Sequence, residues 1–408
     1  MAACFACGAL SAPGQSYALG LYFESFVADL GLTRVTVSSV YAWATVAAAA
    51  LLPFIGRLAD RSSSRRYLGL VVAGMGATLF ALGTANSIVG LAAGFFCLRL
   101  LGQGAIGLGT ITAVLRWFHR HRGRAAAMAA LGYAFGEFTM PAIITALQGQ
   151  VGWRGSMLGL GGAYLLLAML VASVLRDPPG TAPDAGGAAQ RSRPAGTGEW
   201  MRQPVFWSLV ALATIVPTVL TGVALHQLAL FRSVAWSAGD VVSALRAYAI
   251  ANLVATYGAG LLLDRIASKF GVAISMTMLS LALAVPLLGP SIIAGPVVFW
   301  SLLGAAAGSA TGTHGVLWAE YFGVASIGSI KGVVNATRNA ATAAGAVGFA
   351  ALAGPEGDYR LSLLVAATLG GVGLVGAMLL PRSHRGAVAL SVPLTAAVAS
   401  PAASEAAP

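Results

Sequence analysis

The stretch Gly56-Arg-Leu-Ala-Asp60-Arg61 occurs a second time, with changes, as Gly260-Leu-Leu-Leu-Asp264-Arg265. The two copies lie 204 residues apart, and Trp117-Phe118 matches Tyr321-Phe322 at the same offset. A repeat at one fixed offset indicates that the chain consists of two related halves. Duplicated halves that face each other across a central cavity are typical of membrane transport proteins.

The composition of the chain excludes an ordinary soluble protein. Of its 408 residues 9% are charged, 58% are hydrophobic and 52 are glycines. Soluble domains carry roughly 25% charged residues, and glycine is commoner in membrane helices than in soluble ones. Because so few charges cannot cover a water-facing surface, we expect a polytopic helical membrane protein and no enzyme activity.

Each half contains six apolar runs of about the 20 residues that cross a bilayer. In the first half they lie near residues 3–27, 37–57, 67–85, 88–115, 124–149 and 154–175. In the second half they lie near residues 204–230, 241–263, 272–289, 293–319, 327–353 and 361–381. The sequence therefore predicts an all-α membrane protein with twelve transmembrane helices, arranged as two six-helix pseudo-repeats.

These runs divide the chain into four parts. Residues 1–176 are predicted to form an N-terminal six-helix bundle, and residues 204–381 a C-terminal one. The Pro, Gly and Ala-rich segment 177–203 predicts a linker between them. The low-complexity tail, residues 382–408, is predicted to be disordered.

The basic residues indicate the topology. The formal net charge is +11, but Lys and Arg lie in short loops between the apolar runs, such as residues 57–66, 116–124 and 176–202, rather than on one continuous face. Because positive residues favour the cytoplasmic side, both termini and the linker are predicted to be cytoplasmic, in a bacterial-type inner membrane. No nucleic-acid partner is expected.

No pattern in the sequence predicts a cofactor or a metal site. Cys4, Cys7 and Cys97 all lie in apolar runs, so they imply neither a disulfide framework nor a metal centre. The phosphate loop Gly-x-x-x-x-Gly-Lys-[Ser/Thr] is absent, so energy must come from a gradient. The expected partners are a small-molecule substrate and the lipid bilayer, and the expected functional unit is a monomer.

The repeated stretch resembles the motif between helices 2 and 3 of the major facilitator superfamily, and the resemblance extends over the chain apart from the tail. Ser63 and Ser64 stand where Gly and a basic residue are usual, which leaves as matching positions Asp60, Arg61, Asp264 and Arg265. The resemblance implies a cytoplasmic gate, in which a carboxylate at a helix end pairs with an Arg or a facing helix N-terminus. The alternative is that these residues are loop charges that anchor the topology.

A finer resemblance concerns Arg116-Trp-Phe-His-Arg-His-Arg-Gly-Arg124, followed by Gly132, Gly136, Pro141 and Gly152-Trp-Arg154. Together these are similar to the branch of monocarboxylate transporters and oxalate:formate exchangers, and the Gly, Gly, Pro spacing resembles a motif associated with antiporters. The exchangers' second basic residue in helix 8 has no counterpart, and the Asp and Arg pair of monocarboxylate transporters is missing there. These departures argue against a simple dicarboxylate or a lactate-like substrate.

Two arginines are expected near the middle of the membrane. Arg99 and Arg338 each lie about 11 residues from the outer or inner end of a predicted helix, roughly 16 Å at 1.5 Å per residue. A guanidinium on each half suits an anionic substrate, because it binds a carboxylate bidentately and stays charged, so both arginines are predicted to bind the substrate. For Arg99 the alternative is an ion pair with Glu137. Glu137 is otherwise a candidate for proton coupling, because ionisable groups in a bilayer are costly.

Glu24 and His226 are predicted toward the outer ends of helices 1 and 7. A histidine beside a carboxylate titrates near neutral pH, so this pair is a candidate for proton coupling. Each could instead be a solvated interfacial residue. Neutral polar side chains are expected to complete the substrate site, namely Gln15, Tyr22, Asn252, Tyr257 and Asn339.

The leading functional hypothesis is secondary transport of a small organic anion or amphipathic metabolite by alternating access, coupled to protons or to exchange. A second hypothesis is export of a drug-like or toxic compound, favoured by the Gly, Gly, Pro spacing. A third is a membrane sensor or scaffold, for which the sequence offers no appended soluble domain.

Overall fold

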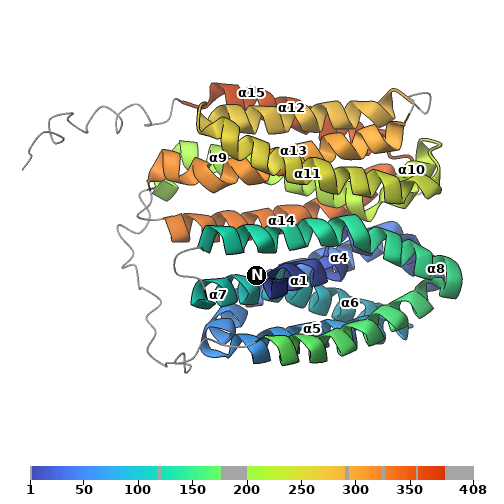
Figure 1. Ribbon diagram of the computed structural model, residues 1–408. Coiled ribbons are helices and arrows are strands. Elements are labelled where there is room, and N and C mark those ends of the chain that lie inside the picture. The colour runs from blue at the N-terminus through green and yellow to red at the C-terminus, as the bar shows by residue number, and fades with distance from the viewer. Residues whose placement is uncertain are drawn as a thin grey trace, which may run out of the picture.

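The computed structural model describes residues 2–117, 122–175, 200–289, 294–323, 327–354 and 357–381. Over these ranges the regular structure is helical, and the helices make twelve passes along the molecule (Figure 1). The prediction of an all-α protein with twelve transmembrane helices is confirmed. The predicted tail and most of the predicted linker lie outside the described residues.

The first half starts with a broken pass and contains two further irregularities. The broken pass comprises α1 (Ala2–Leu10), η1 (Ala12–Gly14), α2 (Ser16–Gly20) and α3 (Phe23–Asp29). Next come α4 (Arg34–Arg61), α5 (Ser64–Gly83), and a fourth pass made of α6 (Ile88–Leu98), the π-helical η2 (Arg99–Ala105) and α7 (Ile106–Trp117). The fifth and sixth passes are the two arms of α8 (Arg122–Val174), which meet at Gly152 (Figure 1). Gly152 has a φ of +69°, which glycine adopts without steric cost.

The second half repeats the six passes with fewer interruptions. After the short turn η3 (Trp200–Arg202), the seventh pass consists of α9 (Pro204–Leu225) and α10 (Gln227–Ser233). A turn, η4 (Ala238–Asp240), leads to the remaining five passes: α11 (Val241–Leu263), α12 (Ser268–Leu287), α13 (Gly295–Phe322), α14 (Ile327–Ala353) and α15 (Arg360–Leu379).

Local sequence explains where several helices begin. The side chains of Thr33, Ser63 and Ser87 accept hydrogen bonds from the backbone N–H groups three residues later, at the starts of α4, α5 and α6. Hydroxyl side chains are preferred at this position because they satisfy N–H groups that have no partner within the helix. In the described part of the chain, seven helical segments are long and apolar enough to cross a membrane by composition alone. The broken first pass, α11, α13 and α14 are not among them, and these elements border the cavity described below.

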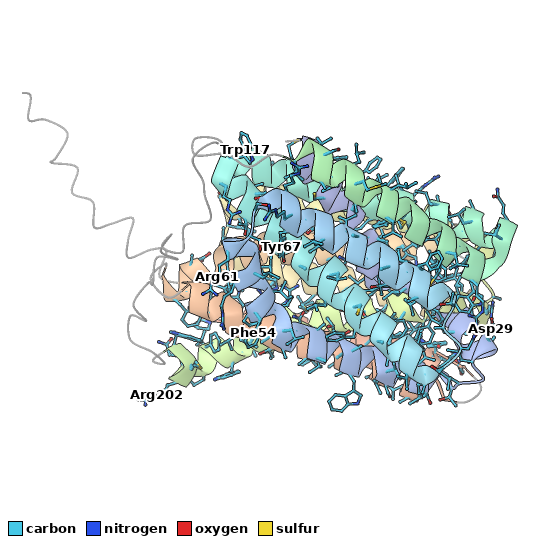
Figure 2. The ribbon with its side chains drawn as sticks, turned by 90° about the horizontal axis from the view of Figure 1, so that it is seen from below. Asp29, Phe54, Arg61, Tyr67, Trp117 and Arg202 are labelled. Atoms are coloured by element: carbon cyan, nitrogen blue, oxygen red, sulfur yellow. The ribbon has the colours of Figure 1, made fainter. Side chains whose placement is uncertain are left out.

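The two halves meet along a few helix pairs. In Figure 1 the helices of the first half lie below those of the second. Contacts between the halves are made by α4 with α14, by α8 with α11 and by α2 with α9. Figure 2 shows Arg61, Trp117 and Arg202 toward one end of the molecule and Asp29 at the opposite end. We name these the Arg61 end, predicted to be cytoplasmic, and the Asp29 end, predicted to be external.

Candidate substrate cavity

A cavity of 390 Å³ lies between the two halves. Each half contributes polar and apolar side chains to its wall. The first half provides Gln15, Ser16, Tyr17, Thr45, Ala48, Ala49, Leu52, Arg99, Gln103, Gly104 and Glu137; the second provides Pro217, Leu220, Thr221, Ala224, Tyr248, Trp300, Asn335, Arg338, Asn339 and Thr342. This volume is in the range of small-molecule sites, which combine an apolar lining with a few polar groups.

Arg338 on α14 is a cation in the cavity wall. Its side chain is partly exposed, and in the described part of the chain it has neither a hydrogen-bond partner nor an ion pair. Asn335, Asn339 and Thr342 line the same wall, at spacings of three and four residues along the helix. Residues at these spacings share one helix face, so α14 presents a polar stripe to the cavity.

Arg99 lies deeper in the wall and is only 2% exposed. Its Nη1 donates to the carbonyl of Gly14 at 3.1 Å, and its guanidinium lies over the ring of Tyr41 at 5.0 Å. That carbonyl is free because the first pass is broken between η1 and α2, so no helical N–H reaches it. A Cβ at Gly14 or at Gly102 would meet the backbone of the other, so glycine at both positions brings the break next to η2. Nε and Nη2 of Arg99 are buried without partners.

Glu137 on α8 does not pair with Arg99. Its Oε2 instead accepts a hydrogen bond from Nδ2 of Asn252 on α11, at 3.1 Å. This bond joins the two halves of the chain. The suggested Arg99–Glu137 ion pair is therefore not formed, because the helix 1 break supplies Arg99 with a closer acceptor and α11 supplies Glu137 with a donor.

His226 sits at the junction of α9 and α10, two residues beyond Ala224 in the cavity wall. Its ring is buried at 1% exposure, and its Nε2 lies 3.1 Å from Oγ of Ser38 and 3.2 Å from the carbonyl of Ala346. The neighbouring Gln227 donates from Nε2 to the carbonyl of Tyr17 at 3.0 Å. These contacts connect α4, α2 and α14 through the seventh pass.

Glu24 does not contact His226 directly, as a titrating pair would require. It binds Arg34 through two hydrogen bonds of 2.9 Å, and its Oε2 lies 3.5 Å from Nη1 of Arg232 on the other half. Glu24 pairs with these arginines because two positive charges stabilise its carboxylate more than the buried neutral ring of His226 would. At the Asp29 end the two halves are thus joined by the partly exposed ion cluster of Glu24, Arg34 and Arg232 and by the buried side chain of His226.

The other predicted polar residues fall into three groups. Gln15 and Asn339 line the cavity, and Asn252 reaches it through Glu137. Tyr22 lies outside the lining, because its hydroxyl is hydrogen-bonded to Ser156 within the first half. Tyr257 also lies outside the lining and is 48% exposed, since its position on α11 faces away from the partner helices.

The predicted gate residues lie at the Arg61 end. The side chain of Asp60 is outside the described part, and Arg61, Asp264 and Arg265 are exposed. Arg116 was not predicted to act here, yet its Nη1 donates to the carbonyl of Ser62 at 2.7 Å and its Nη2 to that of Ala59 at 3.3 Å. It therefore caps the C-terminus of α4, where a cation is favoured.

Several cavity residues were missed from the sequence, among them Ser16, Thr45, Gln103, Thr221, Tyr248, Trp300, Asn335 and Thr342. For Asn335 and Thr342 a signal was present, since they lie three and four residues from Arg338 and Asn339 on one helix face. The aromatic residues carry no such signal, because Tyr and Trp occur equally on packed faces.

Comparison with known proteins identifies the family. A family model described as Major Facilitator Superfamily matches residues 4–231, more than half of the chain. The uncharacterized MFS-type transporter YhjX of Escherichia coli K12 is 27% identical over 243 residues, 57% of this chain and 58% of its own length. Human Monocarboxylate transporter 14 is 31% identical over 193 residues, 45% of this chain and 36% of its own length. The alignments thus span about two fifths to three fifths of these relatives.

Solved structures show the same fold at low identity. A bacterial homologue of the human lysosomal transporter Spinster, inward-facing and unoccupied, matches with a TM-score of 0.70 at 15% identity, over 92% of each chain. The nucleoside transporter NupG matches with a TM-score of 0.70 at 14% identity, over 92% of this chain and 98% of its own. With the twelve helical passes and the cavity between two halves, the chain belongs to the Major Facilitator Superfamily.

Proposed function

We propose that the protein is a secondary active transporter that moves a small organic anion or amphipathic metabolite across a bacterial-type inner membrane, with both termini cytoplasmic. The observation that carries the proposal is Arg338, a guanidinium without an acidic partner in the wall of a cavity between two halves. A permanent cation in such a place favours an anionic ligand, which it can bind through two parallel hydrogen bonds.

Alternating access fits the distribution of contacts. At the Asp29 end the halves are joined by Gln227 with Tyr17 and by Arg232 with Glu24, all of them polar contacts. Such contacts can break and re-form as the halves rock against each other. In this reading Asp60, Arg61, Asp264 and Arg265 form the gate at the Arg61 end in the opposite state.

Proton coupling or exchange would drive the transport. Glu137 lines the cavity and accepts a hydrogen bond from the other half, so protonation of its carboxylate would change a contact between the two halves. Glu24 and His226 occupy the closed end, where protonation would act on closure rather than on the substrate. An ionisable group inside the membrane is costly, which favours a functional role for each.

Export of a drug-like or toxic compound is the second candidate. The observation in its favour is the mixed lining of the cavity, in which Leu52, Leu220 and Trp300 accompany the polar groups. An amphipathic compound would use both kinds of contact.

Uptake into proteoliposomes tests the proposal. With radiolabelled organic acids, Arg338→Lys should raise the apparent KM and retain activity, because it keeps the charge and loses the planar fork. Arg338→Ala should weaken binding about ten- to hundredfold, the loss of a charge-assisted bond of roughly 1.5 to 3 kcal/mol. Arg360→Ala, on an exposed arginine outside the cavity, is the matched control. Unchanged binding in Arg338→Ala would contradict anion transport and favour the export of a neutral compound.

A further inference from the structure

Two opposite charges line the cavity without meeting. Arg338 on α14 and Glu137 on α8 are both partly exposed in its wall. Among the described residues, Glu24 and Asp29 form ion pairs with arginines, and none of these pairs joins Arg338 to Glu137. The third charge in the wall, Arg99, is nearly sealed at 2% exposure. A bound molecule therefore meets one accessible cation and one accessible acid, held by opposite halves of the chain.

The surroundings of Glu137 suit a cationic nitrogen. Tyr17 and Tyr248 lie close enough to Glu137 to interact with it electrostatically, and both line the cavity. Trp300 also lines it and packs edge-to-face against Tyr248, with ring centroids 5.6 Å apart. Aromatic rings next to a carboxylate attract ammonium groups through their negative faces. Among the described residues one hydrogen bond, from Asn252, occupies the Glu137 carboxylate, so the carboxylate retains acceptor capacity.

The surroundings of Arg338 suit a carboxylate. Asn335, Asn339 and Thr342 on the same helix face supply neutral hydrogen-bonding groups beside the guanidinium. No acid on α14 competes for it, because this helix contains neither Asp nor Glu.

Charge balance then selects among ligand classes. A monoanion would pair with Arg338 and leave Glu137 buried under it without a counter-charge. A dianion would add a second negative charge to a cavity that already holds a carboxylate. Unpaired charges are costly to bury, so a monoanion at Arg338 requires a proton on Glu137, whereas a ligand with one charge of each sign compensates both charged groups directly.

We propose that the substrate is a zwitterion, whose carboxylate binds Arg338 and whose cationic nitrogen lies at Glu137 among Tyr17, Tyr248 and Trp300. This inference rests on the proposed function, because it needs the anion site at Arg338, and it adds a second recognition site on the other half. A ligand that bridges the halves contributes to both walls of the cavity, as alternating access requires.

Matched ligand pairs test the inference on the full-length protein in proteoliposomes. Each pair consists of a trimethylammonio carboxylate and the acid of the same shape with a tert-butyl end, for example 4-trimethylammoniobutyrate and 5,5-dimethylhexanoate. Pairs with shorter and longer spacers cover the unknown distance between the two sites. In the parent, the best-fitting zwitterion should bind about tenfold more tightly than its acid, the ratio expected of one desolvated cation–π and charge contact.

Two variants separate the sites. Glu137→Gln keeps an acceptor for Asn252 and should abolish the preference for the zwitterion: the zwitterion should bind more weakly, whereas the acid should bind no more weakly than in the parent, because the uncompensated carboxylate is gone. Arg338→Gln should weaken both members of every pair. Asp358→Asn, in an exposed loop, is the control.

The outcomes distinguish the two proposals. Equal affinity for zwitterion and acid at every spacer length, with Arg338→Gln still weakening both, overturns the zwitterion and leaves the organic anion in place. An equal loss of affinity for both ligands in Glu137→Gln also overturns the zwitterion proposal, since Glu137 would then act on the fold rather than on the nitrogen of the ligand. No Arg338-dependent binding of either ligand overturns the proposed function as well.

Discussion

His226 and Ser38 meet at 3.1 Å across the boundary between the halves, although they are 188 residues apart in the chain. The same Nε2 atom lies 3.2 Å from the carbonyl of Ala346, so one ring atom connects three passes. The other ring nitrogen, Nδ1, is buried with no partner in the described part of the chain. A neutral ring satisfies this arrangement with Nδ1 unprotonated, whereas a charged ring would bury a second N–H without an acceptor.

Acidification should therefore open the Asp29 end. We expect a cysteine replacing Thr221, in a background without native cysteines, to react faster with an impermeant thiol reagent as the pH falls from about 7.5 to about 5.5, the range in which a histidine ring that opening exposes to water gains its proton. Glu24 and Arg34 lie close enough to His226 to interact with its ring electrostatically. His226→Gln should flatten the profile, whereas His314→Gln should preserve it. A profile in the parent that does not change with pH would remove His226 from the gate.

Gly20 should be essential for closing the same end. A Cβ at this position would overlap the carbonyl of Ala224 on α9, so the halves approach here only with glycine. Gly20→Leu should hold the Asp29 end open and expose the Thr221 reporter to the impermeant reagent. Gly149→Leu, where an added Cβ meets nothing within 4 Å, is the matched control. Equal labelling in both variants would contradict the packing of α2 on α9.

Variants of Arg99 should rank in one order for thermal stability and in the opposite order for transport activity. In the described part of the chain its guanidinium makes one hydrogen bond to protein, and its Nε and Nη2 nitrogens have no partner, so its burial is poorly compensated. Arg99→Met should melt no lower than Arg99→Lys, which keeps a buried charge without the planar fork. If Arg99 contributes to anion binding, Arg99→Lys should nevertheless transport better than Arg99→Met. Thermal unfolding in detergent measures the order of stability, and uptake into proteoliposomes measures the order of transport. The same order in both measurements would contradict a role of Arg99 in transport that costs stability.

Gly152 should be required for the bend in α8. Its φ of +69° with ψ of 175° is a conformation essentially confined to glycine, so Gly152→Ala should destabilise the protein by about 1 to 3 kcal/mol. Gly149→Ala, three residues earlier and within the helix, should stabilise it by about 0.5 to 1 kcal/mol, because alanine loses less backbone entropy. Unfolding in detergent provides both values, and a neutral Gly152→Ala would contradict the strained geometry.

The sequence by itself determined the twelve passes and the division into two halves. A bilayer demands about 20 consecutive apolar residues per pass, which is a local property that can be counted along the chain. The bend at Gly152 and the starts of α4, α5 and α6 follow from single residues in the same local way. Arg338 could also be singled out, because a cation in an apolar helix is conspicuous without any knowledge of its neighbours.

Only the tertiary structure decided which side chains meet. Arg99 binds the carbonyl of Gly14 rather than Glu137, and Glu24 binds Arg34 and Arg232 rather than His226. Tyr257 and Asn252 lie on the same helix, yet one is 48% exposed and the other contacts Glu137. Hydropathy specifies that a segment crosses the membrane, but the rotation of each helix about its axis depends on close packing against its neighbours. That packing brings together residues far apart in the chain, 115 positions for Glu137 and Asn252 and 208 for Glu24 and Arg232, which no local pattern encodes.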